Sequence, residues 1–95
     1  SRQEILDLIT QFRQERQDEF GIVRIGIFGS TARDTFSSDS DVDVVVELYE
    51  PDLFKLVGIK QELETLLERP VDIVRYREHM NRFLKERIEE EALYA

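Results

Sequence analysis

Several residue types that build common functional sites are scarce in this sequence. Cysteine is absent and histidine occurs once, which excludes a disulfide framework, a thiolate metal site and a zinc site built from several histidines. No apolar run approaches the roughly twenty residues that a membrane helix needs. No internal repeat or low-complexity linker is present. We therefore expect a cytoplasmic protein without a membrane partner.

Basic residues are also outnumbered. The 95 residues contain 13 Lys and Arg against 21 Asp and Glu, a formal net charge of −8. Nucleic-acid backbones are bound by Lys and Arg that neutralise phosphates, so direct nucleic-acid binding is disfavoured and a basic protein surface is the better partner. With 41% hydrophobic residues, the chain can bury one modest core. We expect a single domain over residues 1–95.

A first motif follows an apolar run. The apolar residues 25–28 are followed by Gly29-Ser30, where the small or missing side chains let another group approach the backbone. A helix beginning there would point its free N–H groups outward, which is typical of a phosphate seat. Arg33 could reach a phosphate, or it could tie down the loop by pairing with Asp34 or Asp39. The residues leave both interpretations open.

A second motif, Asp41-Val42-Asp43, begins a valine-rich run. In a strand, the period of two places Asp41 and Asp43 on one face, where like charges repel unless a cation lies between them. Mg²⁺ takes carboxylate, phosphate and water oxygens. Either motif alone also fits a turn or a solvated strand end. Together, each anchored to its own apolar run, they predict a metal–phosphate site.

The hydrophobic periodicity predicts an α+β or mixed α/β domain, with elements in the order α, β, short α, β, α, β, α. Val42, Val44 and Val46 should share one strand face, with Asp41, Asp43 and Val45 on the other. Asp72 lies on the third strand. The expected ranges are a helix over about 2–18, a strand over 22–28, a helical turn over 31–34, a strand over 41–48, a helix over about 53–68, a strand over 71–75 and a last helix over about 80–94.

The two motifs together resemble a known family. The pattern Gly29-Ser30-x-Ala32-Arg33, then Ser40-Asp41-x-Asp43-x-x-Val46, is similar to the signature of the nucleotidyltransferase superfamily related to DNA polymerase β. Within it, the chain resembles the minimal nucleotidyltransferases (MNT), short prokaryotic proteins encoded beside HEPN-domain partners as toxin–antitoxin pairs. The resemblance covers nearly the whole chain, including residues 71–74 and 84–94. Such sequences commonly have Gly where this chain has Asp34.

The resemblance implies a polymerase β-like fold, a small mixed sheet flanked by helices, and a Mg²⁺-dependent enzyme. Asp41 and Asp43 would hold two Mg²⁺ ions, and Asp72 would hold one and help to deprotonate the attacking hydroxyl. The reaction implied is transfer of AMP from ATP to a hydroxyl, a tyrosine of the HEPN toxin, so that the chain acts as the antitoxin. The residues implied in nucleotide binding are Gly29, Ser30 and Arg33.

Two other functions remain open. The chain could be an antitoxin that works by binding alone, with a non-catalytic nucleotide site; small size, acidity and Asp34 favour this reading, and the intact aspartates weigh against it. It could also be a nucleotidyltransferase for a small molecule or for RNA ends. The lack of an acceptor-binding domain and the acidic surface weigh against these substrates. Homo-oligomers or hetero-oligomers could still build an acceptor pocket between chains.

Overall fold

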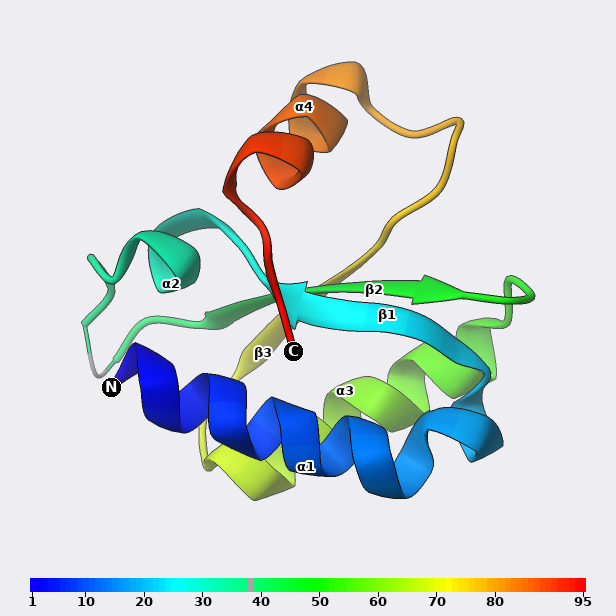
Figure 1. Cartoon of the computed structure of the whole chain (residues 1–95), viewed down its shortest axis with the longest axis horizontal. Coiled ribbons are helices and arrows are strands. Elements are labelled where there is room, and N and C mark those ends of the chain that lie inside the picture. The colour runs from blue at the N-terminus through cyan, green and yellow to red at the C-terminus, as the bar shows by residue number, and fades with distance from the viewer. Residues whose placement is uncertain (38) are drawn as a thin grey trace.

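The computed structural model describes residues 1–37 and 39–95 as a four-stranded sheet with helices on both faces (Figure 1). The predicted α+β class is confirmed, and one further strand, β4, closes the chain. In the described residues, no helix is both long and apolar enough to pass through a bilayer. The elements in chain order are α1 (Arg2–Phe20), β1 (Ile22–Ile27), α2 (Gly29–Arg33), β2 (Val42–Leu48), α3 (Leu53–Leu67), β3 (Val71–Arg75), α4 (Arg82–Glu91) and β4 (Leu93–Tyr94).

The sheet is mixed, with the strand order β3-β2-β1-β4. β1 runs antiparallel to both β2 and β4, whereas β2 and β3 are parallel. Helices α1 and α3 cover one face, α4 covers the other, and α2 lies at the end of the sheet where β1 finishes (Figure 1). The end of β1 therefore lies beside the beginnings of β2 and β3.

The central strand β2 is buried on both faces. Val42, Val44 and Val46 are fully buried in the main core, which also contains residues of α1 and α3. Val45 points to the opposite face, where it packs with Phe28 and with Ile88 of α4. The predicted alternation along β2 is confirmed, and it assigns the odd-numbered residues of this strand to the α4 side of the sheet.

Local signals set the ends of the long helices. Ser1 caps α1, and its hydroxyl accepts a hydrogen bond from the Glu4 N–H at 3.3 Å. Gly21 ends the same helix in the left-handed conformation, with φ of 66°, so α1 continues to Phe20 rather than to about residue 18. The Asp52 carboxylate caps α3 by accepting hydrogen bonds from two backbone N–H groups.

The predicted last helix over residues 80–94 is wrong at both ends. Asn81 caps α4, which begins at Arg82, and Ala92 leaves the helix in an extended conformation. Leu93 and Tyr94 then form β4, in register with Ile27 and Gly26 of β1. A Cβ atom on Gly26 would lie 2.8 Å from the Tyr94 Cα, so the missing side chain makes room for the added strand.

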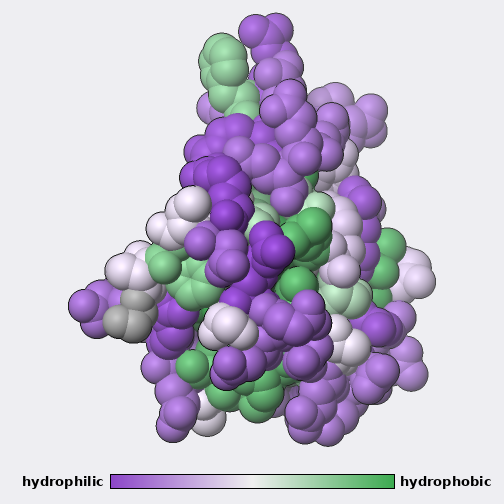
Figure 2. Space-filling model, turned by 60° about the vertical axis from the view of Figure 1, so that its left-hand side comes forward, coloured by the Kyte–Doolittle hydropathy of each residue, from purple (hydrophilic) through white to green (hydrophobic). Residues whose placement is uncertain are grey.

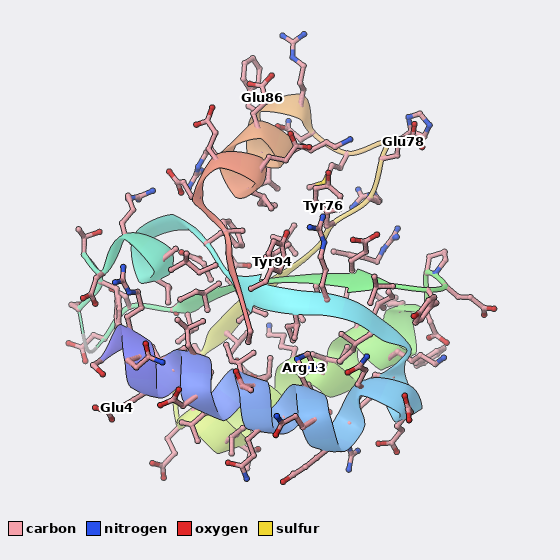
Figure 3. The ribbon with its side chains drawn as sticks, viewed as in Figure 1. Glu4, Arg13, Tyr76, Glu78, Glu86 and Tyr94 are labelled. Atoms are coloured by element: carbon pink, nitrogen blue, oxygen red, sulfur yellow. The ribbon has the colours of Figure 1, made fainter. Side chains whose placement is uncertain are left out.

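Aromatic rings hold this last segment against the sheet. The Arg24 guanidinium lies 4.5 Å from the centre of the Tyr94 ring and 4.9 Å from that of Tyr76, and it pairs with Glu47 at 2.8 Å. Figure 3 shows Tyr76 and Tyr94 approaching each other between α4 and the sheet. Arginine stacked on aromatic faces is stabilised by cation–π attraction, so the Arg24 contact helps to hold Tyr94 of β4 on the sheet.

Candidate functional site

The turn between β1 and α2 brings backbone and carboxylate together. Gly29 adopts a left-handed conformation, with φ of 61°, and turns the chain directly from strand into helix. Helix α2 therefore begins at Gly29 rather than at residue 31, and β1 ends before Phe28. A Cβ atom on Gly29 would lie 2.7 Å from Asp43 Oδ2. The missing side chain of Gly29 thus makes room for a carboxylate of the candidate site, and the predicted approach of a phosphate stays a prediction.

Three aspartates meet at this end of the sheet. Asp43 of β2 and Asp72 of β3 are register partners in the parallel pair, so both project toward the α4 side. Asp41 comes just before β2, not within it as predicted. Partial burial raises the pKa of the Asp43 carboxyl above its ordinary value, and the nearby charges of Asp72 and Asp41 raise it further. The fold thus juxtaposes Asp72 with the other two, a step that the residues alone could not supply.

Two arginines oppose this negative charge. The positive charges of Arg87 and Arg33 both act to lower the pKa of Asp43, with the Arg87 effect the larger. Arg87 belongs to α4, and its Nη2 lies 3.6 Å from the position that a Cβ on Gly29 would occupy. Sequence reasoning gave Arg87 no role, because no short-range pattern connects α4 to the turn at Gly29.

Arg33 has a partner that neither sequence interpretation named. Its Nη1 donates to both carboxylate oxygens of Glu91 on α4, at 2.7 and 2.8 Å. The loop-tying alternative had named Asp34 or Asp39 as the partner, and the observed pair links α2 to α4 instead. The nucleotide-binding role of Arg33 stays a prediction, as do those of Gly29 and Ser30.

A buried hydroxyl fixes the position of Asp43. Thr31 is fully buried, and its Oγ1 accepts a hydrogen bond from the Asp43 N–H at 3.0 Å. On the other side, the Phe28 N–H donates to the Asp43 carbonyl at 3.1 Å. Thr31 occupies the variable position of the Gly-Ser-x-Ala-Arg motif. The sequence signal for this role was a threonine placed between the small residues Ser30 and Ala32, because a hydroxyl that is buried there needs a hydrogen-bond partner.

Arg69 fixes the segment that leads to Asp41. Its Nη2 donates to the carbonyl oxygens of Ser37 and Ser40, and its guanidinium lies 5.0 Å from the centre of the Phe36 ring. The next residue, Pro70, accepts a hydrogen bond from the Val42 N–H at 2.9 Å. The approaches to β2 and β3 are therefore tied together by two residues that lie between the predicted helix over about 53–68 and the predicted strand over 71–75.

The donor set fits a hard cation that arrives with a phosphate ligand. All three predicted ligands, Asp41, Asp43 and Asp72, offer carboxylate oxygens, and their mutual repulsion favours a cation between them. Among the described residues, no three His, Cys, Asp or Glu side chains are gathered into a preformed metal shell. Mg²⁺ commonly takes one or two carboxylates and completes its shell with phosphate and water oxygens. The metal and catalytic roles of the aspartates remain predictions.

The candidate site lies at the surface rather than in a cavity. Asp41 and Asp72 are exposed and Asp43 is half-buried. Figure 2 brings this end of the molecule forward and shows a mainly hydrophilic surface, with hydrophobic side chains visible beneath α4. A cavity of about 370 Å³ lies between α1 and α3, on the opposite face of the sheet, and it contains none of the predicted site residues.

Comparisons with known proteins agree on one family. The nucleotidyltransferase domain family matches residues 9–95. The protein adenylyltransferase MntA of Thermococcus cleftensis is 40% identical over 73 residues, which are 76% of this chain and 74% of that protein. A solved structure provisionally described as a minimal nucleotidyltransferase is 34% identical, with a TM-score of 0.75 and 93% of each chain covered.

A toxin–antitoxin complex has the same fold in one of its chains. It contains the tri-AMPylated HEPN toxin of Shewanella oneidensis bound to an MNT antitoxin. The TM-score is 0.72 at 19% identity, and the alignment covers 99% of this chain and 71% of that one. At this identity, the likeness is one of fold.

Proposed function

Because this chain belongs to the nucleotidyltransferase domain family, we propose that it is a protein adenylyltransferase, which transfers AMP from ATP to a protein hydroxyl. The family resemblance predicted from the sequence is confirmed by that membership. The observation that carries the proposal is the position of the Asp43 carboxylate, 2.7 Å from where a Cβ on Gly29 would lie, with Asp72 in register beside Asp43. The turn predicted to bind phosphate and the acidic cluster would act together there, as the reaction requires.

The proposed reaction is a displacement at the α-phosphorus. The acceptor oxygen forms a bond to this phosphorus and loses its proton, for which the exposed Asp72 carboxylate is the acceptor. The bond from the α-phosphorus to the bridging oxygen breaks, and its electron pair leaves with pyrophosphate. The Ser30 hydroxyl and the backbone N–H groups of the turn hold the β- and γ-phosphates before and during this departure.

Mg²⁺ is part of this proposal. Asp41 and Asp43 would hold two ions, and Asp72 would share one of them. When bound, the ions lower the pKa of the attacking hydroxyl and neutralise the triphosphate. The raised pKa of Asp43, caused by burial and then by the Asp72 charge, supports this assignment, because such a carboxylate gains most from a cation.

We further propose that the acceptor is a tyrosine of a HEPN-domain toxin and that its modification inactivates the toxin. Support comes from the fold neighbour, an MNT antitoxin seen with an AMPylated HEPN toxin. The net charge of −8 favours a basic surface on the partner. The cytoplasmic location predicted from the sequence belongs to the same proposal.

The test uses ATP labelled at the α-phosphorus, Mg²⁺ and, as the candidate toxin, the product of the adjacent gene. We expect the native chain to label the toxin, the Asp41→Asn/Asp43→Asn variant to lose the labelling, and the control Asp18→Asn, changed at an exposed position of α1, to keep it. Peptide mass spectrometry should place the AMP on tyrosine. A stable complex without label would overturn the proposal.

The second candidate is an antitoxin that neutralises by binding alone. It is favoured by the Arg33–Glu91 pair, because Arg33, which was predicted to bind the nucleotide, is instead hydrogen-bonded to a carboxylate of the same chain. Neutralisation of the toxin that survives Asp43→Asn would support binding alone. Loss of neutralisation while the complex persists would support catalysis.

A further inference from the structure

Helix α4 presents two charged residues, Arg87 and Glu91, to the turn and helix at the site. Ile88 lies between them in the sequence and is completely buried against Phe28 and Val45, which fixes the rotation of the helix. Glu91 reaches Arg33 on α2, and Arg87, one helical turn earlier, reaches the space over Gly29. This edge of α4 therefore forms one wall of the site.

The two arginines of the site, Arg33 and Arg87, differ in whether their guanidinium groups have an ion-pair partner. Arg33 is paired with Glu91. Within the part of the chain that the structure describes, the exposed Arg87 guanidinium makes neither an ion pair nor a hydrogen bond, and it lies near Asp43 without forming a salt bridge to it. Arg87 is thus a cation at an acidic site whose hydrogen-bond donors remain available to a ligand.

The position of Arg87 matches the phosphate seat. Its Nη2 is 3.6 Å from the Cβ position of Gly29, and the Asp43 Oδ2 is 2.7 Å from the same position, so the guanidinium and this carboxylate both border the space over the turn. Guanidinium groups bind phosphate through two parallel hydrogen bonds, with geometry that a lysine ammonium cannot reproduce. The neighbouring carboxylates cannot serve this purpose, because they repel phosphate.

We propose that Arg87 binds the β- and γ-phosphates of the nucleotide, together with the backbone of the Gly29-Ser30 turn. This role rests on the proposed nucleotidyl transfer and deepens it, because it makes α4 part of the substrate site. Glu91 complements it by holding Arg33 on α2. The helix that packs on the sheet through Ile88 thereby also recognises the triphosphate.

The test measures equilibrium binding of α,β-imido-ATP and of AMP to the full chain in Mg²⁺. We expect Arg87→Met to weaken binding of the triphosphate about tenfold, the scale of one charge-assisted contact. AMP binding should change less than about twofold, because AMP lacks the phosphates that Arg87 contacts. Arg87→Lys should recover only part of the loss, since a point charge replaces the planar fork.

The matched control is Arg82→Met, on an exposed arginine of the same helix that lies over the Phe83 ring and away from the turn. It should leave both affinities unchanged, and thermal melting of each variant reports folding. Equal losses for triphosphate and AMP, or no loss in Arg87→Met, would overturn the role of Arg87. Absence of triphosphate binding by the native chain would overturn this role and the proposed function together. Binding that obeys the expected pattern without labelling of the toxin would overturn only the proposed function.

Discussion

Asp43 and Asp72 are register partners across the parallel β2–β3 pair, which places two carboxylates on the same side of adjacent strands. Asp43 is half-buried, and burial raises its pKa, with further increases from Asp72 and Asp41. The nearby Arg87 and Arg33 only partly offset this effect, since the net shift is upward. The negative charge of Asp43 therefore destabilises the folded chain when no ligand is bound.

We expect Asp43→Asn to raise thermal stability in EDTA at pH 7 while it lowers transfer by more than about 100-fold, because loss of a direct metal ligand should cost more than loss of an outer-shell partner. A carboxyl whose pKa is raised by folding lowers the free energy of unfolding when it is ionised. This destabilisation is fully present at pH values above the pKa of the folded state. The stability gain of the variant should vanish as pH falls below the ordinary Asp range near about 3.9. Melting curves against pH measure this.

Added Mg²⁺ provides the control for that variant. A metal that binds only the folded state raises the melting temperature, and it should do so for the native chain and much less for Asp43→Asn. An equal Mg²⁺ response in the two proteins would show that Asp43 is not a ligand.

Gly29→Ala should abolish nucleotide binding, because the new Cβ would lie 2.7 Å from the Asp43 carboxylate oxygen at a left-handed φ. Gly21→Ala is the matched control, since Gly21 has a similar φ of 66° but a Cβ there would lie 4.0 Å from the Tyr49 ring, at ordinary van der Waals distance. Both variants should lose roughly 1 kcal/mol of unfolding free energy or more from backbone strain. Only Gly29→Ala should lose binding, measured by titration with α,β-imido-ATP.

Gly26→Ala should detach β4 from the sheet. A Cβ there would collide with the backbone of Leu93 and Tyr94, and overpacking of this kind costs about 1–3 kcal/mol. The measurement is hydrogen exchange of the Ala95 N–H, which donates to the Ile25 carbonyl at 2.9 Å. This amide should exchange faster while amides in the middle of α1 keep their protection. Unchanged exchange at Ala95 would contradict the prediction.

Asp34→Gly should stabilise the chain by about 0.5–1 kcal/mol, because Asp34 ends α2 in a left-handed conformation with φ of 61° that glycine adopts without strain. The family resemblance implies glycine at this position, and the observed φ is one that glycine adopts readily. Glu68→Gly, at the end of α3 with φ of 55°, should give a similar gain. Only Asp34→Gly, which removes a negative charge near the phosphate seat, should also tighten triphosphate binding; equal affinities in the two variants would argue against that charge effect.

The sequence by itself determined the features that arise between near neighbours in the chain. Alternation predicted that Val42, Val44 and Val46 share one strand face, which the structure shows to be the face of the main core. The Gly29-Ser30 turn and the Asp41-x-Asp43 spacing indicated the two halves of the site. Each signal acts within a few residues, where backbone geometry alone fixes which side chains share a face.

Only the tertiary structure decided which distant residues join the site. Strand pairing placed Asp72 beside Asp43, and packing of Ile88 turned Arg87 and Glu91 toward α2. The short strand β4 depended on space above Gly26, so helical periodicity mispredicted the last residues as a continuation of α4. These relationships follow from sheet register and from the burial of a helix face, which are set by contacts between elements far apart in the chain.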